Sequence, residues 1–97
     1  MIITIATGRE ATEIVTLDQV IEASVREAAI KEYDITGSRT CGDVFTYIYE
    51  DDKLKNPIIG EATVTIEHGF KSIIKEFHFE MNANNNQTTI TKTVATY

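Results

Sequence analysis

The side chains in this sequence that are best suited to chemistry are one cysteine and two histidines. Cys41 lies in the stretch TGSRTCGD, where the Arg39 guanidinium could favour the thiolate and a histidine could serve as its base. No known cysteine-enzyme motif surrounds it, and a single free cysteine is most often a small buried hydrophobic residue. His68 and His78, even together with Asp43 and the cysteine, match no zinc-binding spacing. These residues therefore indicate neither a catalytic nor a metal site.

The glycine-containing stretches do not match a nucleotide-binding motif. TGRE and TGSRTCGD contain neither GxGxxG nor GxxxxGK[ST], the patterns whose backbone N–H groups cradle phosphates. EDD at residues 50–52 lacks the spacing of an EF-hand calcium loop. Carboxylates are scattered along the chain, so no general acid–base pair stands out. The sequence predicts no enzyme and no cofactor.

The stretch DVFTYIYE is aromatic and β-branched, and it therefore predicts a strand. Its alternation places Phe45, Tyr47 and Tyr49 on one face. Aromatic residues with a polar tip are enriched at protein interfaces. Base stacking on RNA would need basic neighbours, whereas residues 50–52 are acidic. Whether this face lies in the core or in solvent stays open, because alternation alone does not decide it.

The negative charge of the chain is concentrated in its first half. Residues 1–50 contain nine Asp/Glu and four Lys/Arg, residues 51–97 contain six and five, and the net charge is −6. This distribution disfavours direct binding to nucleic acid or to an anionic membrane. It suits a basic protein partner, although solubility alone is the simpler explanation. The partner-binding residues predicted on these grounds are Glu10, Glu13, Asp18, Glu22, Tyr47 and Tyr49.

A helix that would position part of this surface is predicted over residues 17–33. TLDQ forms a capping box, in which the Thr16 hydroxyl accepts from the Gln19 backbone and the Gln19 side chain reaches back to Thr16. DITGS supplies the turn chemistry that ends the helix. Apolar and small residues recur at helical spacing at Leu17, Val20, Ile21, Ser24, Val25 and Ala28.

The stretch FKSIIKEFHFEM, residues 70–81, fits either a helix or a strand. A helix would expose Phe79, whereas a strand places it on one face with Phe77. The threonine-rich segment 88–96 is a natural strand and needs a neighbour. We therefore interpret residues 73–81 as a strand that forms a hairpin with residues 88–96, and we expect a turn or bulge in place of regular strand over residues 70–74.

Two short β segments before the helix and strands near 44–50 and 58–67 complete the prediction. The stretch IIGEATVTIE alternates regularly, with Val64 and Ile66 on the apolar face. Short connections between sequential strands require antiparallel pairing. The sequence thus predicts a single α+β domain over 1–97, with one capped helix packed on a mostly antiparallel, meandering β-sheet in the order β(β)αββββ.

The sequence also carries expectations about location. The N-terminus lacks the basic region of a secretory signal, and no stretch reaches the roughly 18 apolar residues of a membrane span. A single cysteine cannot form an internal disulfide. We therefore expect a cytoplasmic protein with no membrane partner.

In outline, the chain resembles the small phage-encoded anti-CRISPR proteins, many of which are acidic, place one helix on a small antiparallel sheet and lack enzyme motifs. The segments that carry this resemblance are IITIAT, TLDQVIEASVREAAIKE and VFTYIYE. The resemblance is architectural, so it transfers no functional residue. Cystatin-like inhibitors are similar in outline too, but their QxVxG hairpin is absent here. The resemblance implies an inhibitor that acts in the cytosol of a bacterial host.

These observations lead to the hypothesis of a non-catalytic protein-interaction or inhibitor protein. It would occlude a basic surface on a partner, such as the nucleic-acid-binding surface of a defence complex, without contacting nucleic acid itself. The alternative is a small structural or assembly subunit that forms a homodimer or larger homo-oligomer through an edge strand. Salt dependence separates the two, because an acidic contact weakens as salt rises.

Overall fold

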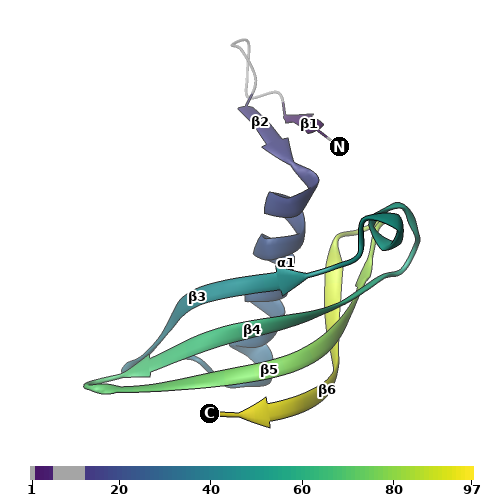
Figure 1. Cartoon of the computed structure of the whole chain (residues 1–97). Coiled ribbons are helices and arrows are strands. Elements are labelled where there is room, and N and C mark those ends of the chain that lie inside the picture. The colour runs from purple at the N-terminus through teal and green to yellow at the C-terminus, as the bar shows by residue number, and fades with distance from the viewer. Residues whose placement is uncertain (1, 6–12) are drawn as a thin grey trace.

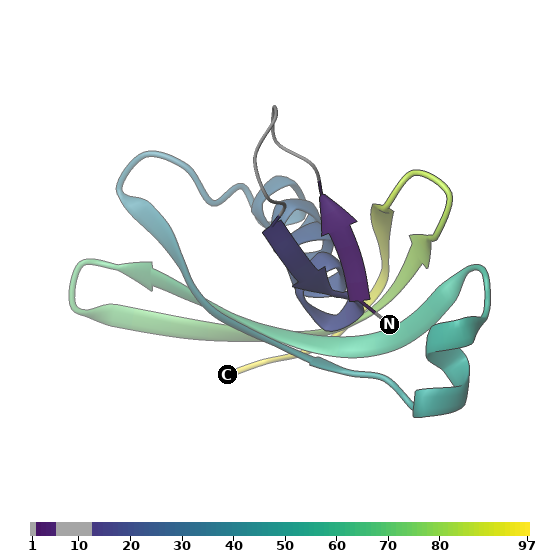
Figure 2. The same ribbon diagram turned by 90° about the horizontal axis from the view of Figure 1, so that it is seen from above.

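One helix lies in the hollow of a curved, four-stranded antiparallel sheet (Figure 1, Figure 2). The computed structural model describes residues 2–5 and 13–97, with side chains from Thr16 onward. In this described part, the order of elements is β1, β2, α1, β3, η1, β4, β5 and β6. The predicted α+β class and the antiparallel meander that follows the helix are confirmed.

The first two strands form a short antiparallel ladder of their own. β1 (Ile2–Ile5) pairs with β2 (Glu13–Thr16), and α1 (Leu17–Glu32) begins directly after β2. Both halves of the predicted capping box are present at this junction. The Gln19 backbone N–H donates to Thr16 Oγ1 at 3.2 Å, and the Thr16 N–H donates to Gln19 Oε1 at 2.9 Å. No helix in the described part of the chain is long and apolar enough to cross a membrane.

The four-stranded sheet follows chain order, so each strand pairs with its sequence neighbour. Its strands are β3 (Arg39–Tyr47), β4 (Ile58–His68), β5 (Lys71–Asn82) and β6 (Gln87–Thr96), and the 3₁₀ helix η1 (Glu50–Leu54) connects β3 to β4. β3 and β6 are consequently the two edges of this sheet. β4 and β5 form a long hairpin that extends past the helix (Figure 1).

The core lies between α1 and the concave face of the sheet. Phe77 and Phe79 on β5 are fully buried, as the strand interpretation of this segment requires. Burial of each large apolar side chain stabilises the fold by about 1.5–3 kcal/mol. The Tyr33 ring closes the core beside Phe77, at 5.8 Å between ring centroids, and partial burial raises the pKa of its phenol. The buried apolar residues are Leu17, Ile21, Val25, Ala29, Ile35, Val44, Ile58, Ala62, Val64, Ile66, Phe77, Phe79 and Met81.

Two predicted boundaries are wrong. β5 begins at Lys71 and pairs regularly with β4, and the connecting turn is confined to Gly69 and Phe70. The prediction of a turn or bulge is therefore wrong for residues 71–74. Gly69 has φ of +64°, a conformation that glycine adopts without strain, and this lets the hairpin close tightly. β3 begins at Arg39, before the predicted start near residue 44, because residues 39–41 pair with the end of β4 ahead of a register shift.

Candidate functional site

The face of the sheet opposite the helix carries an exposed aromatic cluster. Phe45 and Tyr47 alternate along β3 with Val44, which is buried under the helix. Tyr47 is 58% exposed, and Tyr49, just beyond the strand, is 84% exposed. Ile59 on β4 is also exposed beside them. The sequence left open which side of the aromatic strand faces water, and the structure places the tyrosines in solvent.

The two tyrosines line a shallow pocket of about 580 Å³, which we call the tyrosine pocket. Tyr47, Tyr49 and Ile59 supply its apolar surface. Its polar side chains include Asp52 on η1, Glu61 on β4 and His78 on β5. His78 Nε2 lies 3.3 Å from Glu61 Oε1, across the β4–β5 ladder. The pocket therefore combines aromatic rings with carboxylates.

A second pocket, of about 320 Å³, lies where the start of α1 passes over β3, and we call it the helix pocket. Asp18 and Glu22 line it from the helix. Thr46 and Ile48 line both this pocket and the tyrosine pocket, so the two pockets meet across the same stretch of edge strand. The predicted partner-binding residues of the helix and of β3 thus lie on two sides of one edge.

Two of the predicted partner-binding residues cannot be placed at the site, because their side chains lie outside the described part of the structure. Glu13 lies in β2, and its side chain is outside the described part of the structure. Glu10 lies outside the described residues altogether. Of the two helix carboxylates predicted to bind a partner, Glu22 pairs with Arg26 at 3.3 Å, which partly neutralises its charge.

Asp18 also forms an ion pair, with Lys53, which the sequence analysis did not predict. Lys53 Nζ lies 2.8 Å from Asp18 Oδ1 and 3.2 Å from Glu50 Oε1. The hydrogen bond to Asp18, followed by the one to Glu50, raises the pKa of Lys53 above its ordinary value. Asp18 therefore fixes η1 against the helix as well as lining the pocket.

Cys41 contacts a cation, and neither of the two histidines is placed to act as its base. The Arg26 guanidinium lies 3.4 Å from Cys41 Sγ and donates to the Gly42 carbonyl at 2.8 Å. His68 Nε2 is instead 3.0 Å from Ser38 Oγ, and His78 points to the opposite face of the sheet. Arg26 consequently ties the helix to the irregular part of β3, and the candidates for nucleophilic chemistry are not brought together.

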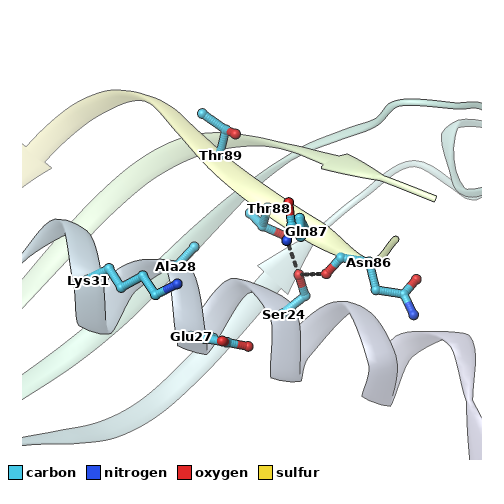
Figure 3. A pocket seen from close by; sticks show the side chains of 8 residues that line it. All are labelled: Ser24, Glu27, Ala28, Lys31, Asn86, Gln87, Thr88 and Thr89. Atoms are coloured by element: carbon cyan, nitrogen blue, oxygen red, sulfur yellow. Dashed lines mark hydrogen bonds between the residues drawn. The ribbon is translucent and has the colours of Figure 1, made fainter. Parts of the chain in front are cut away.

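A third, polar pocket of about 210 Å³ lies between the middle of α1 and the start of β6 (Figure 3). Ser24 on the helix is buried there and donates to the Asn86 carbonyl. Its hydroxyl also lies 2.6 Å from Thr88 Oγ1, which must then be the donor because serine has one proton to give. These bonds join the helix to the β5–β6 turn, and we interpret the pocket as a structural contact.

Sequence reasoning did not predict that Asp52, Ile59, Glu61 and His78 belong to the tyrosine pocket. The signal was present in part, because Glu61 falls on the polar side of the alternating β4 segment. The missing information was the β3–β4–β5 register, which sets Tyr47 opposite Glu61 and Glu61 opposite His78.

Within the described residues, no group of three or more histidine, cysteine or acidic side chains is arranged to hold a metal ion. Comparison of the chain with protein families, curated proteins and solved structures finds no match. The function therefore has to be argued from the site itself.

Proposed function

We propose that this protein is a non-catalytic interaction protein that occludes a basic surface on a protein partner. The observation that carries this proposal is the exposure of Tyr47 and Tyr49 beside the carboxylates of Asp52 and Glu61. Tyrosine is among the residues that most often dominate binding energy at interfaces, because it buries a large rigid ring and keeps a polar tip.

The charge of the open face supports a basic partner. The β4–β5 register places Glu61, Glu67, Glu76 and Glu80 on the face that the helix leaves uncovered. On β6, Lys92 lies opposite His78 on the same face. An acidic surface speeds encounter with a basic one and penalises acidic competitors. Aromatic anchors would then supply much of the affinity, with carboxylates supplying orientation.

The architectural resemblance to anti-CRISPR proteins suggests which basic surface to test first. The DNA- or RNA-binding surface of a bacterial defence complex is rich in lysine and arginine, and a small acidic protein that covers it would block access by nucleic acid. Homo-oligomerisation through an edge strand is the competing hypothesis, and the net charge of −6 on each copy opposes it.

The test is a pull-down of tagged protein from bacterial lysate, at about 0.1 M and about 1 M salt, over which the Debye length falls from about 10 to about 3 Å. We expect one stoichiometric partner that is lost at high salt and with the Tyr47→Ser/Tyr49→Ser variant. Tyr97→Ser is the matched control, because the exposure of Tyr97 (70%) lies between those of the two pocket tyrosines and it follows β6, outside the pocket lining. Recovery of the protein alone at both salt concentrations would contradict the proposal and favour the homo-oligomer.

A further inference from the structure

The edge of the sheet at β3 is open over residues 44–47. β3 pairs on one side with β4 and has no strand on its other side within the described part of the chain. These residues make no backbone hydrogen bond outside that ladder among the described residues. The Gly42 carbonyl nearby is already taken by Arg26, so the open stretch begins after the register shift.

The two pockets lie on opposite faces of this open stretch. The helix pocket contains Asp18, Glu22 and Lys53 on the concave side and reaches Phe45 at the edge, and the tyrosine pocket contains Tyr47 and Tyr49 on the other side. Side chains of a strand alternate between the two faces of its sheet. A strand added alongside β3 would therefore send successive side chains alternately into the two pockets.

We infer that β3 binds an extended, basic segment of the partner as an added strand. The inference rests on the proposed function and specifies how the partner is held. Main-chain hydrogen bonds along residues 44–47 supply affinity, while the pockets select the side chains. A lysine or arginine in the helix pocket would share Asp18 and Glu22 with their present partners, Lys53 and Arg26. An apolar residue or arginine suits the tyrosine rings of the other pocket.

The other edge of the sheet is less suited to adding a strand. β6 pairs with β5 through two register shifts, at Glu76/Phe77 and at His78/Phe79, and such irregularities protect edges from pairing, whereas the register shift of β3 lies before its open stretch at residues 44–47. A second copy of this chain is also a poor occupant of β3, because each copy carries a net charge of −6 and two copies repel each other. The charge of the site thus favours a basic segment over self-pairing.

The probe is a fluorescein-labelled peptide of about six residues, the usual length of a strand, with alternating lysine and valine. Its matched control carries N-methyl groups on alternate amides, which removes the N–H donors of one edge and leaves charge and side chains unchanged. Anisotropy with the full-length protein measures affinity, and hydrogen exchange followed by NMR locates protected amides. We expect saturable binding, protection confined to residues 44–48, and a loss of about tenfold or more on N-methylation and in Tyr47→Ser/Tyr49→Ser.

The possible failures separate this inference from the proposed function. If the N-methylated peptide binds equally well, or if protection falls on β6, strand addition at β3 is overturned and occlusion by the acidic face stands. If the peptide does not bind at all, strand addition is overturned, and the salt-dependent pull-down decides the proposed function by itself. If residues 44–48 are protected in the protein alone, in a concentration-dependent dimer, a second copy occupies the edge and the inference is wrong.

Discussion

The ammonium group of Lys53 lies 2.8 Å from the Asp18 carboxylate and so joins the 3₁₀ helix after β3 to the first turn of α1. The same contact forms one wall of the helix pocket, and it reduces the negative charge that Asp18 offers to a partner. Asp18 is therefore a weaker binding candidate than its exposure suggests, whereas the tyrosines have no such internal role.

This ion pair predicts a loss of stability at alkaline pH. The pKa of Lys53 is raised in the folded protein above the ordinary value of 10.5, so its contribution is complete below that pH and is lost as pH rises through the folded pKa. Urea unfolding above pH 10.5 should therefore show a shallower decline for Lys53→Met than for wild type. Tyr33, whose pKa is also raised, adds a decline of the same sign that both proteins share. Lys92→Met, away from the pair, should follow wild type; coincident curves for wild type and Lys53→Met would refute the prediction.

Truncation of two phenylalanines in one segment should have very different effects on stability. Phe77 is fully buried, whereas Phe70, at the tip of the β4–β5 hairpin, is fully exposed. Phe77→Ala should lower the free energy of unfolding by about 3–5 kcal/mol, and Phe70→Ala should change it by less than about 0.5 kcal/mol. Urea denaturation measures both. If Phe77→Ala does not fold, Phe77→Leu provides a smaller loss to compare, and equal effects at the two positions would contradict the strand assignment.

The sequence could predict elements whose causes are local. The capping box needs only Thr16 and Gln19, and the face of β4 follows from the alternation around Val64. Strand ends were less predictable, because β3 extends back to Arg39 only through pairing with His68, which lies on a distant part of the chain. A turn-like composition there is overridden by the partner strand.

The candidate site was predictable to a smaller degree. The sequence shows the alternation of Tyr47 and Tyr49. Which face of the strand is exposed to solvent depends on the face against which the helix packs, and this is decided by tertiary packing. The match of Lys53 to Asp18, and of Arg26 to the Gly42 carbonyl, likewise depends on side chains that meet only after folding. A count of charged residues therefore overestimates the negative charge that Asp18 and Glu22 offer to a partner, because each forms an ion pair within the protein.

Gly60 lines the tyrosine pocket, and its surroundings leave too little space for a larger side chain. A Cβ at this position would lie 2.6 Å from Ile48 Cγ1 and 3.0 Å from the Tyr47 carbonyl oxygen. Gly60→Ala should lower the free energy of unfolding by about 1–3 kcal/mol, the usual range for overpacking. Ile48→Ala removes the closest clashing atom, so the double variant should lose less than the sum of the single losses. Additive losses in urea unfolding would show that the clash lies elsewhere.

The buried hydroxyl of Ser24 predicts a local effect on the β5–β6 turn. Ser24→Ala removes the donor to the Asn86 carbonyl and the acceptor for Thr88, and it should cost about 1 kcal/mol of stability. Amides of the turn should exchange faster, because the helix no longer holds them. Ser72→Ala, at an exposed position on β5, is the control. Unchanged exchange in Ser24→Ala would show that the turn is fixed by its own hydrogen bonds.

The exposed tyrosines predict a separation of binding from stability. Tyr47 and Tyr49 lie outside the core, so Tyr47→Ser/Tyr49→Ser should change the free energy of unfolding by less than about 0.5 kcal/mol for each substitution. If they anchor a partner, the same variant should weaken binding by about 2 kcal/mol or more. Urea unfolding and titration with the partner found by pull-down measure the two quantities. A variant that loses stability and binding in parallel would make the tyrosines structural, because residues selected for contact should be dispensable to the isolated fold.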